Sequence, residues 1–255
     1  MLSGVAELLE MDPELLDDLK TSVSEACNNV VLHAYGDRTG PMSVRLFADD
    51  EALRVVVDDE GVGLDASVAT ADLSHGIGVS VIQALTSEAS FESRPGGGTE
   101  VSMRFDGRRD DRRLYRPPGA ATEDAELTGL ADGEVGLTLS PVSLLTGVLG
   151  RLARTLAATA HFSLDRFSDV YLITDTLAAH AGRAAAGERI TARLSAGERR
   201  LELVLGPFVP GTGAVLKTAA EDPVSSPLAH LADEISVREC GSGETIDVVV
   251  VDHRR

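Results

Sequence analysis

The sequence predicts an α+β fold, in which each half of the chain is a two-layer sandwich with helices on one face of a mostly antiparallel sheet. Three observations carry this prediction. One long N-terminal segment has helical apolar spacing, and two pairs of short apolar runs are joined by polar or glycine-rich turns. The second half of the chain repeats this order of elements.

Composition sets the broad class of protein. Apolar residues make up 43% and charged residues 25% of 255 residues, an ordinary globular balance. There is no apolar run of about 18 residues and no signal-peptide pattern before Lys20, so we expect a cytoplasmic protein without a membrane span. The two cysteines cannot build a disulfide framework. A net charge of -18 argues against direct nucleic-acid binding; it permits a basic protein partner but also serves solubility alone.

The first predicted helix has recognisable ends. Asp12 is placed as its N-cap, Pro13 lies in its first turn and Gly36 is its C′ residue. Glu25 and Asn29 lie one turn apart, about 40° from each other on the helix surface and away from the apolar stripe. Taken alone, this pair is more typical of a solvated, exposed helix face. The apolar stripe consists of Leu16, Leu19, Val23, Ala26, Cys27 and Val30.

The segment "SVRLFADDEALRVVVDDEGVGLD" predicts two strands joined by a polar turn. The second strand runs directly into Asp59, with Gly61 and Gly63 close behind it. A carboxylate at a strand end can accept a hydrogen bond from an exocyclic amine, and glycines let the backbone approach a flat ligand. The alternative is a simple turn between a strand and a loop.

The next segment, "SHGIGVSVIQALTSEASFES", places Gly76 and Gly78 at the start of a helix. Free N–H groups at such a start form an anion site. A hairpin, "SRPGGGTEVSMRF", follows, and Thr99 begins its return strand. No phosphate-binding G-K-[ST] motif occurs.

The order of these four motifs resembles the GHKL (Bergerat-fold, histidine-kinase-like) ATPase superfamily. More narrowly, "VSEACNNVVLHAYG" and "DDEGVGLD" resemble the bacterial anti-sigma-factor serine/threonine kinases. The resemblance covers about residues 5–105 and implies ATP and Mg²⁺ as ligands. It also implies site roles: a general base at Glu25, a Mg²⁺ ligand at Asn29, adenine contacts at Asp59, Gly61, Gly63 and Thr99, and phosphate contacts at Gly76 and Gly78. His33 and Tyr35 are interpreted as structural, a helix-end cap and a packing aromatic.

The resemblance supports two hypotheses of function. The first is an ATP-dependent protein serine/threonine kinase that phosphorylates an antagonist protein and controls a sigma factor. The second is a non-catalytic, ATP-responsive binding module. Two departures from the family bear on this choice. Only "LSGVAELLEMD" precedes the helix, where relatives carry a further strand, and this difference argues against a family-type homodimer. The loop from Gly63 to Gly76 resembles a shortened ATP lid.

Three domains are predicted: an ATP-binding domain at 1–105, an Arg/Pro/Gly-rich linker at 106–138, and a degenerate Bergerat-like domain at 139–255. In the last, Ser163 is a predicted helix N-cap, Asp175 takes the place of Glu25 and Ala179 that of Asn29. We therefore expect no second nucleotide site, and an intramolecular pseudo-dimer in which this domain replaces a second subunit. An unrelated α/β domain is the alternative. The pairs that support a repeat are Leu85 and Leu231, Glu88 and Glu234, Gly97 and Gly243, and Thr99 and Thr245.

Overall fold

The chain forms two compact units in the computed structural model. The N-terminal unit comprises Leu2 and Ala6–Thr138, and the C-terminal unit comprises Met1, Ser3–Val5 and Leu139–Arg255. The structure describes residues 2–49, 51–63, 77–94, 96–106, 130–131, 134–218, 228–241 and 243–253.

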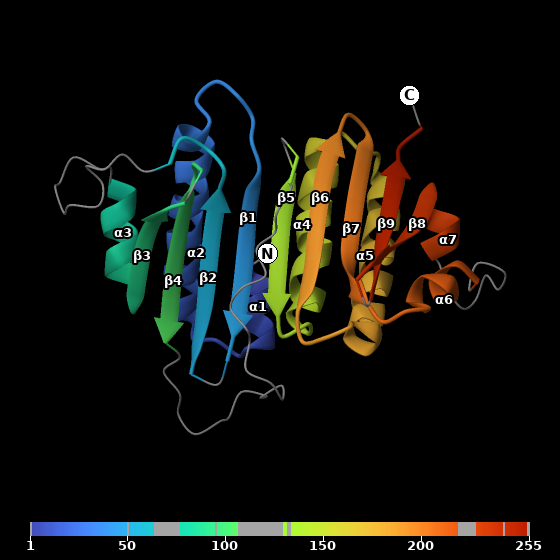
Figure 1. The fold of residues 1–255 in the computed structure, drawn as a ribbon, viewed down its shortest axis with the longest axis horizontal. Coiled ribbons are helices and arrows are strands. Elements are labelled where there is room, and N and C mark those ends of the chain that lie inside the picture. Colours follow the sequence, from blue (N-terminus) through green and yellow to red (C-terminus); the bar gives the residue numbers. More distant parts are fainter. Residues whose placement is uncertain are drawn as a thin grey trace. The chain divides into compact units, whose positions relative to one another are not determined.

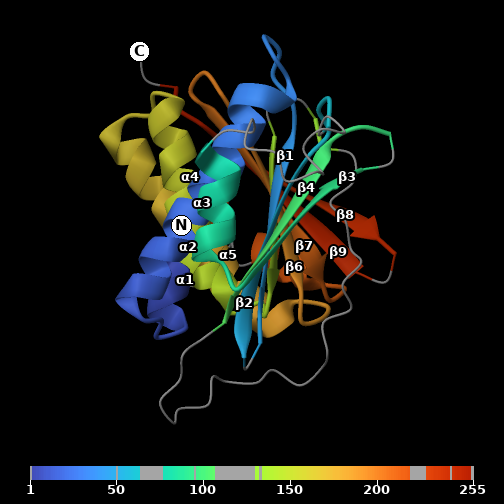
Figure 2. The same ribbon diagram turned by 90° about the vertical axis from the view of Figure 1, so that its left-hand side faces the viewer.

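The N-terminal unit contains a four-stranded antiparallel sheet with the order β3-β4-β2-β1. Helices α2 and α3 lie on one face of it (Figures 1 and 2). An α+β architecture with antiparallel strands is thus confirmed for this unit. Its elements are α2 (Pro13–Asn29), the π-helix η1 (Val30–Ala34), β1 (Met42–Ala48), β2 (Ala52–Asp59), α3 (Ile77–Leu85), β3 (Glu88–Ser93) and β4 (Thr99–Asp106). The residues of α1 (Leu2–Leu8) are divided between the two units.

The core of this unit lies between the sheet and α2. Side chains alternate between the two faces of a strand, so every second residue of β2 and β4 points toward the helices. These residues are apolar and buried: Leu53, Val55, Val57, Val101, Met103 and Phe105. The buried residues of α2 recur every three or four positions: Leu19, Ser22, Val23 and Ala26. Burial of one large apolar side chain contributes about 1.5–3 kcal/mol, so this layer fixes α2 firmly on the sheet.

The predicted start of α2 is confirmed in detail. Asp12 is the N-cap and its side chain accepts a hydrogen bond from the backbone N–H of Glu14 at 2.8 Å. The end of the helix differs from the expectation, because the chain passes after Asn29 into the π-helix η1 before it reaches Gly36. Gly36 has φ +60°, as a C′ glycine requires. π-helical turns of this kind occur often at functional sites.

In the C-terminal unit four antiparallel strands form a sheet region with the order β6-β7-β9-β8. Helices α4 and α5 lie on one face of that sheet (Figure 1). The helix predicted to follow Ser163 is confirmed as α5. The elements are α4 (Leu144–Thr159), α5 (Leu164–Ala184), β6 (Ile190–Gly197), β7 (Arg200–Phe208), α6 (Thr212–Thr218), α7 (Leu228–Leu231), β8 (Glu234–Cys240) and β9 (Gly243–Val251).

The four strands of each unit have the same connectivity. In each unit a long helix precedes a hairpin, a helix follows, and the last strand lies between the second strand and the third. Leu85 and Leu231 each end a helix, and Glu88 and Glu234 each begin the strand that follows. This correspondence agrees with the predicted repeat. A duplication of one domain and the predicted boundaries at 105 and 138 stay predictions.

Three features of the fold were not expected from the sequence. Helix α1 forms in the segment before Asp12, and Gly4 lies so close to Gly147, in the same unit, that a Cβ on Gly4 would be 2.0 Å from the carbonyl oxygen of Gly147. The strand β5 (Val135–Ser140) begins inside the predicted linker. Ser163 is the N-cap residue of α5, but its hydroxyl makes no capping bond and is buried without a partner.

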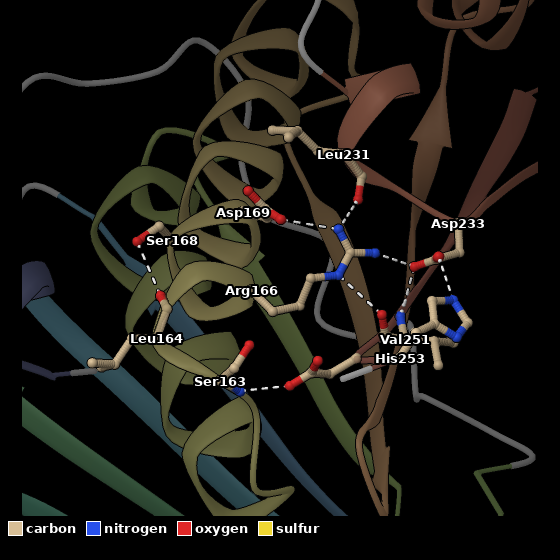
Figure 3. A network of polar contacts seen from close by, with 10 residues as sticks. Ser163, Leu164, Arg166, Ser168, Asp169, Leu231, Asp233, Val251 and His253 are labelled. Atoms are coloured by element: carbon tan, nitrogen blue, oxygen red, sulfur yellow. Dashed lines mark hydrogen bonds and ion pairs between the residues drawn. The ribbon is translucent and has the colours of Figure 1, made fainter. Parts of the chain in front are cut away.

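A polar network around Arg166 fixes the start of α5 in the C-terminal unit (Figure 3). The guanidinium donates to the carbonyl oxygens of Val251 at 3.0 Å and Leu231 at 2.7 Å. It also pairs with Asp169 at 3.0 Å and with Asp233. One side chain therefore joins α5 to the end of α7 and the end of β9.

Among the helices in the described ranges, none has both the length and the apolar character that a membrane span requires.

Candidate functional site

Helix α2 carries the first two predicted site residues. Glu25 and Asn29 are both half-buried rather than fully exposed. They lie near the C-terminal end of α2, and η1 begins at the residue after Asn29. A residue of α3, Gly78, lies beside them.

Gly78 of α3 lies directly against both side chains. A Cβ on Gly78 would be 2.8 Å from Oε2 of Glu25, 3.6 Å from Oδ1 of Asn29 and 3.8 Å from its Nδ2. Gly78 is the second residue of α3, so the first turn of that helix faces Glu25 and Asn29. Unpaired N–H groups and the positive end of the helix dipole favour negative charge at this place. Gly76 lies outside the described residues.

Asp59 ends β2 and is buried, with 4% of its surface exposed. Its Oδ1 accepts a hydrogen bond from the backbone N–H of Gly61 at 2.8 Å, and the backbone N–H of Thr99 also donates to the carboxylate. Burial raises the pKa of Asp59, and the neighbouring charge of Asp58 raises it further, whereas the two backbone donors and Arg94 act in the opposite direction. The carboxylate is thus held in one orientation at the end of the sheet.

The glycines around Asp59 are placed by close contacts. A Cβ on Gly61 would lie 2.2 Å from the carbonyl oxygen of Ala34, to which Val62 donates a hydrogen bond at 2.9 Å. Gly98 has φ +95°, and its Cβ would lie 2.1 Å from the carbonyl oxygen of Asp59. Only glycine fits at these two positions without a backbone shift. Gly63, with φ +78°, lies against Gly98.

The described site residues form two groups, and each group contacts the segment made of α2 and η1. Glu25, Asn29 and Gly78 form the first group. Asp59, Gly61, Gly63 and Thr99 form the second. The second group is attached to Ala34, at the end of η1, through Gly61 and Val62. A polar first group beside a helix start and a second group with one oriented carboxylate can together bind a ligand that has an anionic end and an amine.

Asp58 is a charged residue next to the site that the sequence did not single out. It points to the opposite face of the sheet, where the Ser43 hydroxyl donates to it and Arg45 and Arg94 lie at 3.3 and 3.5 Å. Burial raises its pKa, while these three partners act to lower it. Strand alternation alone separates Asp58 from Asp59. A small cavity borders both, and its lining is Pro41, Ser43, Asp58, Asp59, Glu60, Arg94 and Leu130.

Tyr35, predicted to be a packing aromatic, also makes two hydrogen bonds through its hydroxyl. Its ring packs against Gly40, as a packing aromatic should, but its hydroxyl also donates to the carbonyl oxygen of Pro41 at 2.5 Å and accepts from the backbone N–H of Glu60 at 2.8 Å. These two hydrogen bonds go to backbone groups, so no sequence motif could predict them. His33 is exposed in η1.

The N-terminal unit is of the class of α+β domains that pack helices on one face of an antiparallel sheet and gather glycines and carboxylates at the ends of those elements. The family described as a histidine kinase-like ATPase domain matches residues 1–105. This chain belongs to that family.

Curated relatives are similar over the same region. The anti-sigma F factor of Caldanaerobacter subterraneus subsp. tengcongensis is 36% identical over 105 residues, which cover 37% of this chain and 73% of that protein. The serine-protein kinase RsbW of Bacillus velezensis is 34% identical over 124 residues, 43% of this chain and 78% of the relative. The serine-protein kinase RsbW of Bacillus subtilis is 33% identical over 124 residues, which again cover 43% of this chain and 78% of the relative.

Proposed function

We propose that this chain is an ATP-binding regulatory protein that transfers the γ-phosphoryl group of ATP to a serine or threonine of an antagonist protein and so controls a sigma factor. Three points support the proposal: membership of the histidine kinase-like ATPase family, similarity to proteins named anti-sigma F factor and serine-protein kinase, and the contact of Gly78 with both Glu25 and Asn29. The last observation carries the most weight, because it brings the predicted base and metal ligand to one helix start.

The residues present fit ATP and Mg²⁺. The glycine at position 78 keeps the space beside Glu25 and Asn29 open, since any side chain would fill it. The Asn29 amide oxygen is a hard ligand of the kind Mg²⁺ takes from protein. Mg²⁺ supplies charge neutralisation for the phosphates. Asp59 would accept the adenine amino group, and the first turn of α3 would bind phosphate oxygens.

Glu25 has the chemistry of a general base in this proposal. It would accept the proton of the attacking hydroxyl as that oxygen bonds to the γ-phosphorus, while the bond to the β-phosphate oxygen breaks and ADP leaves. Phosphoryl transfer depends mainly on positioning and on charge stabilisation. The rigid attachment of α2 to the sheet suits this requirement.

A non-catalytic binding module is the second candidate, and one observation favours it. The Glu25 carboxylate of α2 lies against the start of α3, where a negative charge stabilises a helix whether or not it takes part in catalysis. In this case ATP changes the affinity of the chain for a protein partner, without phosphoryl transfer.

Both candidate functions require ATP binding, which calorimetry with Mg²⁺-ATP tests. We expect one ATP per chain, with loss of at least about tenfold in affinity in Asn29→Ala. Asn28→Ala is the matched control, because Asn28 is the preceding residue of α2 and is exposed. No ATP binding by the wild type would refute both candidates.

Phosphoryl transfer from γ-labelled ATP to proteins that co-purify with the chain then separates the two candidates. The kinase requires that Glu25→Gln loses transfer while it keeps ATP binding. If the wild type and Glu25→Gln both bind ATP and neither transfers phosphate, the binding module is correct.

For the C-terminal unit we propose a domain without a nucleotide site that serves as an intramolecular partner. Asp175 and Ala179, the counterparts of Glu25 and Asn29, are exposed on α5, and alanine cannot bind Mg²⁺. The carboxylate of Glu244 accepts hydrogen bonds from the backbone N–H groups of Gly211 at 2.6 Å and Gly213 at 2.8 Å, so it occupies the glycine-rich start of α6. A monomer in light scattering with one ATP per chain is the expected result; a dimer or two ATP per chain would contradict it.

A further inference from the structure

Tyr35 makes a contact that the proposed site does not use. Its phenol oxygen lies between the carbonyl oxygen of Pro41 at 2.5 Å and the amide nitrogen of Glu60 at 2.8 Å. A hydroxyl has one proton to donate and lone pairs to accept with. The hydroxyl therefore donates to Pro41 and accepts from Glu60, and its single proton is used.

The two partners of Tyr35 lead to the same strand pair. Pro41 immediately precedes β1, and Glu60 immediately follows β2. Met42 and Asp59, the neighbouring residues, are paired across these two strands. Tyr35 itself follows η1, so its hydroxyl joins the end of the α2 segment to the sheet at the point where Asp59 stands.

The ring of Tyr35 is fixed as well as its hydroxyl. A Cβ on Gly40 would lie 2.1 Å from Cε1 of the ring, so the ring rests directly on the Gly40 backbone. The peptide of Glu60 is thus held on one side by Tyr35, and the next two residues are held by Ala34. The backbone of residues 60–62 therefore has little conformational freedom once the contacts with Tyr35 and Ala34 are made.

We infer that Tyr35 is a positioning residue for base recognition, which sets the orientation of the Asp59 carboxylate through the Glu60 peptide. This inference rests on the proposed function, since it assumes that Asp59 accepts the exocyclic amine of adenine. Tyr35 itself touches no ligand. The oriented Asp59 carboxylate selects adenine over a purine with a carbonyl oxygen at that position, because only an oriented acceptor discriminates between donor and acceptor groups.

The test compares ATP with ITP, in which a carbonyl oxygen replaces the exocyclic amine, on wild type and Tyr35→Phe by calorimetry with Mg²⁺. The substitution keeps the ring and removes one hydroxyl whose hydrogen bonds are part-buried and exposed, so water can satisfy the two backbone groups. We expect the wild type to prefer ATP. In Tyr35→Phe the ratio of the two affinities should fall about tenfold, mainly through weaker ATP binding.

Tyr171→Phe is the matched control, because Tyr171 belongs to the C-terminal unit and is 47% exposed. It should leave the ratio unchanged. Gly40→Ala is a second, independent variant, since its methyl group would displace the Tyr35 ring while the hydroxyl remains. It should lower the ratio in the same direction, and should add nothing when combined with Tyr35→Phe.

The possible outcomes distinguish a failure of the inference about Tyr35 from a failure of the proposed function. Equal losses for ATP and ITP in Tyr35→Phe would mean a merely structural role and would overturn the inference, while the proposed nucleotide site would stand. An unchanged ATP affinity would overturn it too. Absence of ATP binding by the wild type would overturn both the proposed function and the inference.

Discussion

Gly78 and Glu25 approach so closely that a methyl group on Gly78 would lie 2.8 Å from Oε2 of Glu25. The contact joins α2 to the first turn of α3, over a sequence separation that includes the whole first hairpin.

Gly78→Ala should therefore separate function from folding. Oε2 is the far end of a flexible side chain, so Glu25 can move away at little cost in stability, and alanine favours a helix by about 0.5–1 kcal/mol over glycine. We expect a thermal midpoint close to that of the wild type, with phosphoryl transfer or ATP affinity reduced about tenfold or more, measured on the same preparation.

Gly182→Ala controls for the helix effect in the Gly78 experiment. Gly182 is an exposed residue of α5 with no atom within 4 Å of its Cβ position. It should raise the free energy of unfolding slightly and leave nucleotide binding alone. Wild-type transfer and wild-type ATP affinity in Gly78→Ala would show that the position of Glu25 does not matter.

Gly98→Ala should destabilise the N-terminal unit far more than Gly96→Ala. Both glycines have φ near +100°, which costs about 1–3 kcal/mol for an alanine. Only Gly98 adds a backbone collision, since its Cβ would lie 2.1 Å from the carbonyl oxygen of Asp59, whereas no atom lies within 4 Å at Gly96. In urea unfolding followed by circular dichroism, Gly98→Ala should lose at least about 2 kcal/mol more than Gly96→Ala. Equal losses would contradict the close packing of the hairpin turn on Asp59.

Asp59 should give ATP binding and stability opposite dependences on pH. Burial raises its folded-state pKa above the ordinary 3.8, so the folded chain binds this proton more tightly than the unfolded chain does. Its contribution to stability is fully present below pH 3.8 and is lost as pH rises through the folded pKa. ATP binding needs the ionised acceptor and should weaken as pH falls through that same range.

Asp59→Asn should remove both dependences. Titration calorimetry and thermal unfolding are measured for both proteins over the same pH series. Because ATP is protonated equally in both titrations, its own protonation cancels when the two affinities are compared. The assignment of Asp59 would be refuted by identical pH profiles in the wild type and the variant.

Glu244→Gln should lower the thermal stability of the C-terminal unit without creating a second ATP site. Hydrogen bonds from Gly211 and Gly213 lower the pKa of Glu244 below its usual 4.5. Its stabilising contribution is therefore present above pH 4.5 and is lost as pH falls through the lower, folded-state pKa. Glu239→Gln, an exposed glutamate of β8, is the control. A second ATP in Glu244→Gln would mean that the carboxylate blocks a working site.

Local sequence signals were sufficient for the elements that position the site. The Asp12 cap, the spacing of Leu19, Val23 and Ala26, and the two hairpins each depend on residues a few positions apart, which periodicity and turn chemistry describe well. The same signals did not predict η1, because the change from α- to π-helix depends on what packs beyond Asn29. They also missed β5, whose short alternation follows a polar segment.

The sequence by itself determined which side chains are available: an acid and an amide one helical turn apart, a carboxylate at a strand end, and glycines where backbones must approach. The tertiary structure alone decided that Gly78 lies against Glu25, that Gly98 covers Asp59, and that the Tyr35 hydroxyl reaches Glu60. These contacts join residues distant in the chain. They depend on strand register and on the ångström-scale fit between layers, and no local pattern of residues encodes either.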